Sequence, residues 1–256
     1  MKRPIVLVIG GHDPSGGAGI TADVETITAL GGRAASVVTA LTVQDTRGVQ
    51  SFEPTSLSLL ISQARAILED LPIACIKTGM LATREQVEAV HTLLVDTELP
   101  LICDPVLAGG QGDALSTSDL SDAIRELLIP RARLITPNSV ELRKLAPEGD
   151  STPACARELL ELGVEAVLVS GGHEPGDHII SSLYTQTAPE RSWSQPRLAG
   201  EFHGTGCTLA SACACALAQG HTLESAVDSA LQFTWNALVH AEHPGRGQGL
   251  PTRNCG

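Results

Sequence analysis

The sequence alternates short apolar runs with longer segments of helical periodicity from its N-terminus to about Gly172. The apolar runs, which predict strands, are Ile5–Ile9, Ser36–Leu41, Ile73–Lys77, Leu99–Cys103, Leu134–Thr136 and Ala166–Ser170. The helical segments between them are Ala18–Leu30, Leu57–Asp70, Thr83–Val95, Ser118–Leu128, Val140–Leu145 and Cys155–Leu162. Alternation of this kind predicts an α/β fold with a mostly parallel sheet and helices on both of its faces.

The pattern changes after Gly172. Ile179–Thr185 and Arg191–Leu198 are typical of a hairpin or edge pair, and two helices are predicted over Thr205–Gln219 and Leu223–Glu242. We find no linker and no internal repeat, and 256 residues suffice for one large core, so a single domain over residues 1–256 is expected. With only six aromatic residues (two Trp, one Tyr, three Phe), that core must be aliphatic, which suits buried parallel strands.

Charge and cysteine content narrow the classes of function. The chain carries 17 basic and 29 acidic side chains, a net charge of −12, which disfavours nucleic acid and anionic membrane surfaces as partners. A phosphorylated ligand can still bind through backbone amides, helix N-termini and a metal ion. The seven cysteines include no Cys-x-x-Cys pair, which indicates reduced thiols and a cytoplasmic protein. The apolar run after Arg3 is too short for a signal peptide, and no segment approaches the roughly 20 apolar residues of a membrane span.

A glycine-rich loop, residues 10–19, joins the first predicted strand to the first predicted helix. In an open α/β sheet, ligands bind at the carboxyl ends of strands, so this loop is well placed for one. It lacks the Gly-Lys-Ser/Thr of a Walker A loop, whereas Gly17-x-Gly19-x-x-Ala22 loosely fits a dinucleotide fingerprint. The acidic residue that should end the second strand and hold a ribose is missing, because Asp45 lies past the predicted strand. A plain strand-to-helix turn remains the alternative.

A second segment, residues 203–208 (His-Gly-Thr-Gly-Cys-Thr), begins a predicted helix. The consecutive amides of Gly204, Thr205, Gly206 and Cys207 would form an anion site, with the helix dipole adding partial positive charge. A cysteine there is expected to ionise more readily than a free thiol, which makes Cys207 a candidate proton acceptor or polarising group. Equally, Gly-Thr-Gly could merely start a helix in which Cys207 packs as a small apolar residue.

Polar residues follow several other predicted strands. Asn138-x-x-Glu141 fits a capping box, but Glu141 could also hold Mg²⁺ together with Asp104, since Mg²⁺ uses few carboxylates and keeps several waters. Gln44 offers both a donor and an acceptor, which the edge of a flat aminopyrimidine would match. Met80 and Val106 could line the faces of such a ring.

Seven segments, in one order along essentially the whole chain, resemble the hydroxymethylpyrimidine/phosphomethylpyrimidine kinase family. They are Gly-His-Asp-Pro-Ser-Gly-Gly-Ala-Gly (11–19), Val-Gln-Asp-Thr-Arg-Gly (43–48), Gly-Met-Leu (79–81), Asp-Pro-Val (104–106), Thr-Pro-Asn-x-x-Glu (136–141), Gly-Gly-His (171–173) and His-Gly-Thr-Gly-Cys-Thr (203–208). Each segment is a weak signal, but the combination is highly specific.

The resemblance implies a ribokinase-like three-layer α/β/α sandwich, usually a homodimer, and two ATP-dependent steps of thiamine biosynthesis. Hydroxymethylpyrimidine becomes its monophosphate and then its diphosphate. The residues around the pyrimidine would be Gly11, Asp13, Asp23, Gln44, Met80 and Val106. The Mg-ATP end would comprise Asn138, Glu141, Asp104, Ser170 and Gly172. Cys207, with the amides of Gly204, Thr205 and Gly206, stands where many related sugar kinases carry an aspartate base.

Two departures from the family pattern remove positive charge near the expected phosphates. Ser170 stands where many members have a lysine before Gly-Gly-His, and residues 107–112 lack another lysine often found there. We hypothesise that Arg246, in the C-terminal glycine-rich loop, supplies the missing charge at the ATP end. A pyridoxal or pyridoxine kinase of the same superfamily is the nearest alternative function. A dinucleotide-binding oxidoreductase and a catalytically silent ligand-binding relative are more distant ones.

Overall fold

The computed structural model describes residues 3–95, 97–107 and 118–254. Within them a nine-stranded sheet has the order β3-β2-β1-β4-β5-β6-β7-β8-β9. The strands are β1 (Ile5–His12), β2 (Arg33–Asp45), β3 (Gly48–Pro54), β4 (Ile73–Thr78), β5 (Leu101–Cys103), β6 (Leu134–Ile135), β7 (Ala166–Val169), β8 (His178–Thr185) and β9 (Arg191–Pro196). Neighbours from β2 to β7 pair in parallel, whereas β3, β8 and β9 join antiparallel at the two edges.

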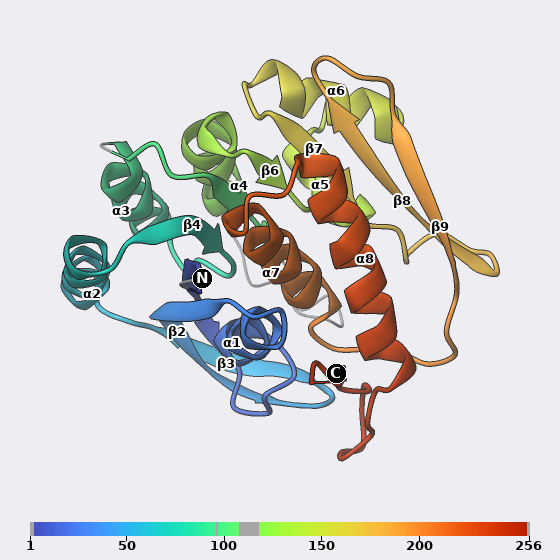
Figure 1. Ribbon diagram of the computed structural model, residues 1–256, viewed down its shortest axis with the longest axis horizontal. Coiled ribbons are helices and arrows are strands. Elements are labelled where there is room, and N and C mark those ends of the chain that lie inside the picture. The colour runs from blue at the N-terminus through green and yellow to red at the C-terminus, as the bar shows by residue number, and fades with distance from the viewer. Residues whose placement is uncertain (1–2, 96, 108–117, 255–256) are drawn as a thin grey trace.

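Helices cover both faces of this sheet, giving three layers (Figure 1). They are α1 (Gly19–Ala29), α2 (Leu57–Asp70), α3 (Arg84–Val95), α4 (Ser118–Ala123), α5 (Ser139–Leu145), α6 (Thr152–Glu161), α7 (Thr205–Ala218) and α8 (Leu223–Val239). Helices α2 to α6 cover one face, and α1, α7 and α8 cover the other. Within the described residues, none of the helices combines the length and the hydrophobicity that a bilayer crossing requires.

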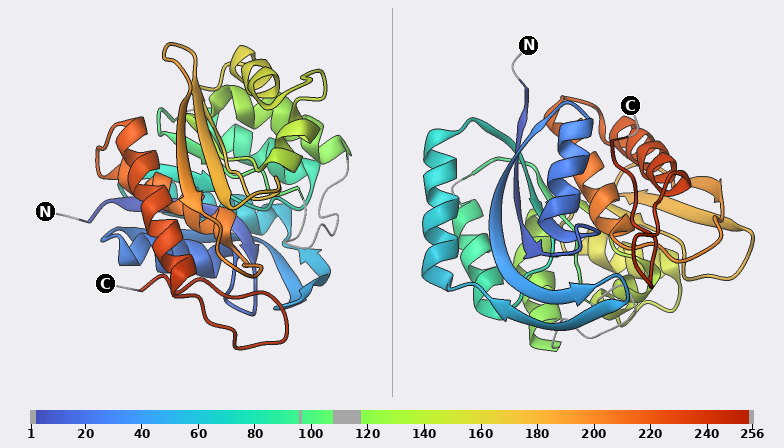
Figure 2. Two further views of the ribbon diagram at one scale, coloured as in Figure 1. Left: turned by 90° about the vertical axis from the view of Figure 1, so that its right-hand side faces the viewer. Right: turned by 90° about the horizontal axis from the view of Figure 1, so that it is seen from below.

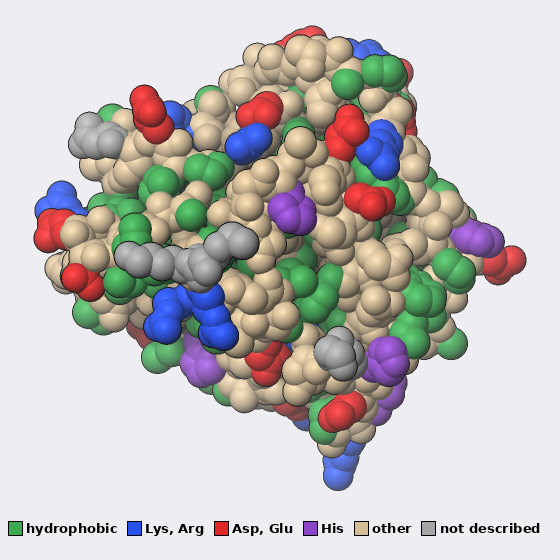
Figure 3. Space-filling view, in the orientation of Figure 1, with side chains coloured by type: hydrophobic (Ala, Val, Ile, Leu, Met, Phe, Trp, Pro, Cys, Tyr) green, Lys and Arg blue, Asp and Glu red, His purple; other side chains and the backbone are tan. Residues whose placement is uncertain are grey.

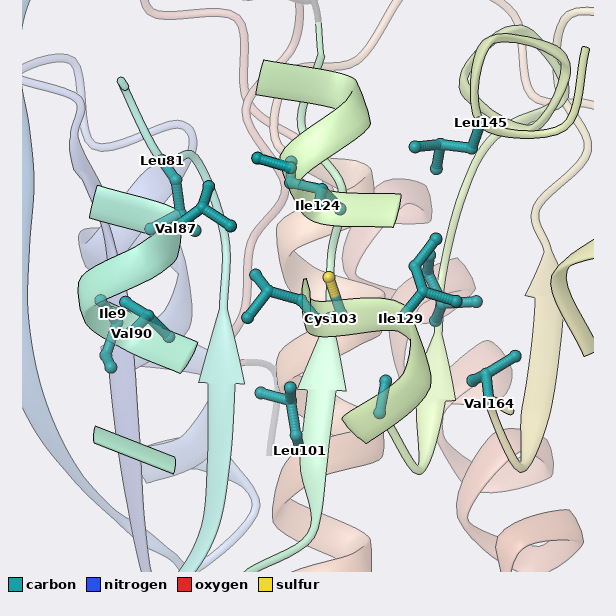
Figure 4. Packing of buried hydrophobic residues seen from close by; sticks show 14 of the residues in the cluster. Ile9, Leu81, Val87, Val90, Leu101, Cys103, Ile124, Ile129, Leu145 and Val164 are labelled. Carbon is teal, nitrogen blue, oxygen red and sulfur yellow. The ribbon is translucent and has the colours of Figure 1, made fainter. Parts of the chain in front are cut away.

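The alternation of side chains along each buried strand divides the core into two apolar clusters. In β1, Leu7 and Ile9 pack against α2 and α3, while Val6 and Val8 pack against α1 and α7. All four are at most 2% exposed. The first cluster also takes in buried residues of the other covering helices, among them Ile124 (Figure 4). Because both faces are covered, the strands consist of continuous apolar runs, and the predicted three-layer α/β fold with a mostly parallel sheet is confirmed.

The edge next to β2 differs from the prediction. β2 continues to Asp45 and turns into β3, which the sequence pattern did not reveal. This hairpin bends away from the layers, as Figure 2 shows. Leu41 and Val43 are 52% and 56% exposed, so no apolar face marks this part of the chain. Asp45 therefore does end the second strand, contrary to our expectation.

The predicted helix over Ser118–Leu128 is also more irregular than expected. After α4, residues Ile124–Leu128 form a π-helical turn and Ile129–Arg131 a 3₁₀ turn. Pro130 in the latter removes a backbone donor, which is consistent with the helix ending there. The glycine-rich stretch that follows Leu107 lies outside the described residues.

Candidate active site

The predicted polar motifs meet at the carboxyl ends of the parallel strands. Gly11 is the next-to-last residue of β1, Met80 lies two residues past β4, Asp104 directly follows β5, Asn138 lies three residues past β6 and Ser170 directly follows β7. Parallel strands present their carboxyl ends at one edge of the sheet, so these residues share that edge. The N-terminus of α7 faces the same region: a Cβ added to Gly206 would lie 3.8 Å from Oδ1 of Asp104.

The two glycine-rich segments are in direct contact. Gly204 has φ 74°, and a Cβ there would overlap with the carbonyl oxygen of Gly17. A Cβ on Gly17 would in turn lie 2.6 Å from the His203 ring. Glycine is therefore required at both positions, at Gly204 for conformation as well as for space. This contact places the start of α7 beside the loop that follows β1.

Arg253, which we did not predict as a site residue, fixes this contact from the C-terminus. Its guanidinium is almost completely buried and donates to Thr208 Oγ1 at 2.9 Å and to the carbonyl oxygens of Gly16 and Gly17. An ion pair of 2.9 Å with Glu25 completes its contacts to α1. The residue stands in a tail without regular structure, so no periodicity in the sequence could have indicated its role.

Asp13 organises the glycine-rich loop internally. Its carboxylate accepts from the amides of Ser15 and Ala18, both at 2.8 Å, from the Ser15 hydroxyl at 2.9 Å and from His203 Nε2 at 3.0 Å. Burial raises its pKa, but the hydrogen bonds from His203 and Ser15 outweigh burial and lower the pKa to about 2. The carboxylate thus occupies the N-terminus of α1, where a dinucleotide fold would bind its pyrophosphate. This geometry contradicts the oxidoreductase alternative.

The predicted pyrimidine residues are brought together around Met80 and Gln44. A Cβ on Gly11 would lie 3.1 Å from the Met80 sulfur, and Val106 packs in the same small apolar cluster as Met80. The half-buried Gln44 lies 2.6 Å from His203 Nε2. Gln44 also lines an open pocket of about 430 Å³ together with residues of the glycine-rich loop and the C-terminal loop, including Arg246.

Beneath the site lies a buried lysine that the sequence pattern had assigned to a strand. Lys77 has no exposed surface, and its Nζ lies 2.9 Å from Asp23 and 3.4 Å from Asp104. Burial lowers its pKa, but the two carboxylates outweigh burial and raise it, so the lysine is charged. Asp23 also accepts from Ser211 at 2.7 Å and has no exposed surface. In this structure Asp23 therefore reaches the site through Lys77, and its predicted contact with a pyrimidine stays a prediction.

The structure contradicts our expectation for Cys207. Burial raises the pKa of its thiol to about 12; Lys77 opposes this effect, and the carboxylates of Asp104 and Asp23 add to it. The thiol is therefore neutral near pH 7, despite its place at the N-terminus of α7. The helix dipole alone does not decide the charge of this sulfur.

The sequence left helix capping and metal binding as alternative roles for Glu141, and the structure shows the first. The capping box is present: Asn138 Oδ1 accepts from the Glu141 amide at 2.9 Å, and Glu141 Oε2 accepts from the Asn138 amide at 3.0 Å. Yet burial and the nearby charge of Asp104 raise the pKa of Glu141 to about 8, and burial also raises that of Asp104. Two buried carboxyl groups near one another are a suitable donor set for a divalent cation, and Asp104 Oδ2 makes no hydrogen bond, although it lies 3.4 Å from Lys77 Nζ.

The predicted nucleotide residues lie at the ends of β6 and β7. Asn138 and Ser170 form an isolated bridge, and the Ser170 amide donates to Pro137 at 3.0 Å. Arg197, another residue that we did not predict, donates to the carbonyl oxygen of Gly172 at 2.8 Å and to two further carbonyls of the same loop.

Arg246 lies elsewhere. Its loop binds the β2–β3 turn, where the Gln248 amide donates to the Thr46 carbonyl at 2.8 Å. β2 and β7 are five strand positions apart, or roughly 24 Å at about 4.8 Å per strand. The structure thus places Arg246 at the Gln44 end of the site, and this corrects its assignment to the ATP end.

On the face shown in Figure 3, acidic and basic side chains are interspersed.

Comparisons with known proteins agree with this geometry. A family model described as phosphomethylpyrimidine kinase matches residues 13–252. The chain is 39% identical over 252 residues to the hydroxymethylpyrimidine/phosphomethylpyrimidine kinase of Streptomyces coelicolor, covering 96% of this chain and 93% of that protein. The phosphomethylpyrimidine kinase structure from Clostridium difficile is 30% identical, with a TM-score of 0.80 and coverage of 93% and 100%. The pyridoxal kinase from Staphylococcus aureus is 25% identical, with a TM-score of 0.90 and coverage of 99% and 94%. The chain belongs to the phosphomethylpyrimidine kinase family.

Proposed function

We propose that this kinase transfers the terminal phosphoryl group of ATP to hydroxymethylpyrimidine and then to its monophosphate, for thiamine biosynthesis. The observation that carries the proposal is the position of Gln44. Its amide, a paired donor and acceptor, lies beside the contact between the glycine-rich loop and the N-terminus of α7. An aminopyrimidine held by Gln44 would direct its hydroxymethyl group toward that N-terminus. The names of relatives that are up to 39% identical over nearly the whole chain support the same substrate.

The catalytic contribution of this chain would be positioning and charge stabilisation, which supply most of the rate in phosphoryl transfer. The amides of Gly204, Thr205 and Gly206 would stabilise the negative charge of the transferring group. Cys207, with its neutral thiol, would contribute its own amide and an S–H donor. Lys77 adds a fixed positive charge below this N-terminus, close enough to act on the Cys207 sulfur.

We further propose that Asp104 and Glu141 hold Mg²⁺, and that Asn138, Ser170 and Gly172 contact ATP. When bound, Mg²⁺ would neutralise charge on the ATP phosphates. The raised pKa of both carboxyl groups supports the site, because a cation would relieve their mutual repulsion. Within the described residues no group of three or more His, Cys, Asp or Glu is placed to hold a metal, so water and phosphate would supply the other ligands.

The domain organisation, the oligomeric state and the cellular location belong to the same proposal. We propose a single domain over residues 1–256, supported by the continuous sheet, and a homodimer, supported only by the family resemblance. A cytoplasmic location is supported by the six cysteines in the described part of the chain, which are all free.

A pyridoxal kinase is the alternative, favoured by TM-scores of about 0.9 to the Staphylococcus aureus enzyme, which has been solved with pyridoxal. The deciding experiment measures ATP consumption with Mg²⁺ on hydroxymethylpyrimidine, its monophosphate and pyridoxal in parallel. Turnover of both pyrimidines, with pyridoxal weak, is expected. Turnover of pyridoxal alone would replace the proposed substrate, and turnover of none would contradict kinase activity.

A further inference from the structure

One nitrogen of His203 lies against two side chains that were not expected to share it. Nε2 is 3.0 Å from Asp13 Oδ2 and 2.6 Å from the terminal amide of Gln44. His203 is almost fully buried, and its partners lie 190 and 159 residues away in the sequence. The nitrogen therefore connects the glycine-rich loop to Gln44, which lines the open pocket described above, the proposed acceptor pocket.

The charge of Asp13 determines which atom carries the proton. With a pKa near 2, this carboxylate is ionised, and it already accepts hydrogen bonds from Ser15 and Ala18. A contact of 3.0 Å between the carboxylate and an unprotonated nitrogen would place two lone pairs together. Nε2 must therefore carry a hydrogen and donate it to Asp13, in the neutral ring or in the imidazolium.

A protonated Nε2 in turn determines the orientation of the Gln44 amide. The structure has the Gln44 amide nitrogen 2.6 Å from Nε2, where its hydrogens would meet the ring N–H. Exchanging the amide nitrogen and oxygen places the carbonyl oxygen at this position, and it then shares the single Nε2 hydrogen with Asp13. The NH₂ group then faces Thr42 Oγ1 at 3.2 Å, and that hydroxyl donates its only hydrogen to the carbonyl oxygen of His12 at 2.9 Å. In this orientation every donor meets an acceptor, whereas in the opposite one the Thr42 hydroxyl would need two hydrogens.

The imidazole itself is firmly held. Its ring occupies the space where Gly17 would carry a Cβ, and the His203 amide donates to the carbonyl oxygen of Gly249 at 2.9 Å. The His203 ring, the Asp13 carboxylate and the Gln44 amide thus form a chain of hydrogen bonds, and the buried charge of Asp13 determines which atom donates in each bond. Gln44 retains one lone pair and one N–H for a ligand.

We propose that His203 is a positioning residue that holds the Gln44 amide in this single orientation. The acceptor pocket then selects a ring edge on which a donor and an acceptor stand in one order, as on an aminopyrimidine. A freely turning amide would accept either order. This inference rests on the proposed function and adds a determinant of substrate specificity to it.

A double-mutant cycle tests the coupling between the two residues. His203→Leu should raise KM for hydroxymethylpyrimidine about tenfold, the effect of one lost hydrogen bond, and leave KM for ATP unchanged. His203→Gln, whose amide can donate from the position of Nε2, should recover most of the affinity. In a Gln44→Ala background His203→Leu should have no further effect on KM. His91→Leu, in α3, removes a comparable hydrogen bond to the Leu127 carbonyl and serves as the matched control.

NMR of nitrogen-labelled protein gives a second readout that needs no variant. The expected result is a protonated Nε2 on His203 at neutral pH. An unprotonated Nε2, or an equal KM increase from His203→Leu with and without Gln44, would overturn the inference while leaving the proposed function intact. Wild-type protein that does not turn over hydroxymethylpyrimidine would overturn both.

Discussion

Replacing Lys77 by methionine tests whether the buried charges under the site depend on this one cation. The substitution keeps the length of the side chain and removes the ammonium, which leaves Asp23 and Asp104 unpaired in a region where both are at most 5% exposed. Breaking a buried ion pair from one side costs about 3–5 kcal/mol, because the remaining charge stays buried without a partner. With a urea m-value of about 2–3 kcal/mol/M, the unfolding midpoint should fall by about 1–2.5 M.

The loss should also depend on pH. Burial already raises the pKa of Asp104, and without the ammonium that pKa rises further above the value of about 3.9 in the unfolded chain. A raised folded-state pKa lowers stability as pH increases through it, so the variant should lose more stability at about pH 8 than at about pH 5.5. Adding Asp23→Asn to Lys77→Met should recover part of the loss.

Urea unfolding followed by circular dichroism measures these differences, with Arg191→Met as control because its ion pair with Glu224 lies on the surface. That control should shift the midpoint far less. A shift below about 0.5 M for Lys77→Met, or one independent of pH, would refute the reasoning, since it would show that the carboxylates are already neutral or hydrated in the folded protein.

Other substitutions test the loops around the site. Asp13→Asn should lower the free energy of unfolding by about 2 kcal/mol at neutral pH. Because the folded-state pKa of Asp13 is lowered to about 2, the extra stability of the wild type should be complete above about pH 4 and disappear as pH falls through about 2. Urea titrations across that pH range measure this difference. Cys207→Ala should lower kcat but keep every inflection of the pH–rate profile between about pH 6 and 9, because the thiol has a pKa of about 12. If the variant loses an inflection in that pH range, the wild-type enzyme uses a thiolate. Gly204→Ala should lower kcat at least tenfold, because the added Cβ overlaps with the Gly17 carbonyl and shifts the start of α7. Gly31→Ala is the control for the effect of positive φ, because Gly31 also has a positive φ but a Cβ there meets nothing within 4 Å.

The sequence predicted those parts of the site that follow buried strands. Because the strands are short apolar runs, their ends were visible, and the residues after them necessarily meet at one edge of the sheet. Asn138 and Glu141 were placed in this way, together with their capping geometry. Met80 and Val106 were likewise placed by the strands that precede them.

The remaining features depend on pairings that no local pattern contains. Lys77 ends a predicted strand and reads as its polar boundary, yet its partner Asp23 lies 54 residues earlier, on α1. The expected acidity of Cys207 considered one helix terminus and omitted the two carboxylates that β5 and α1 bring near it. Arg246 was assigned by the charge that the ATP end lacks, whereas its place is set by hydrogen bonds of its loop to Thr46.

The anchoring of the glycine-rich loop by Arg253 has a consequence for biosynthesis. The bond between this guanidinium and Gly16 spans 237 residues, nearly the entire chain. At translation rates of about 5–20 residues per second, the ribosome finishes the loop roughly 12 to 50 seconds before it adds the arginine that holds it. The nascent polypeptide can assemble its central strands in that interval, but the glycine-rich loop gains this anchor only after Arg253 has been added.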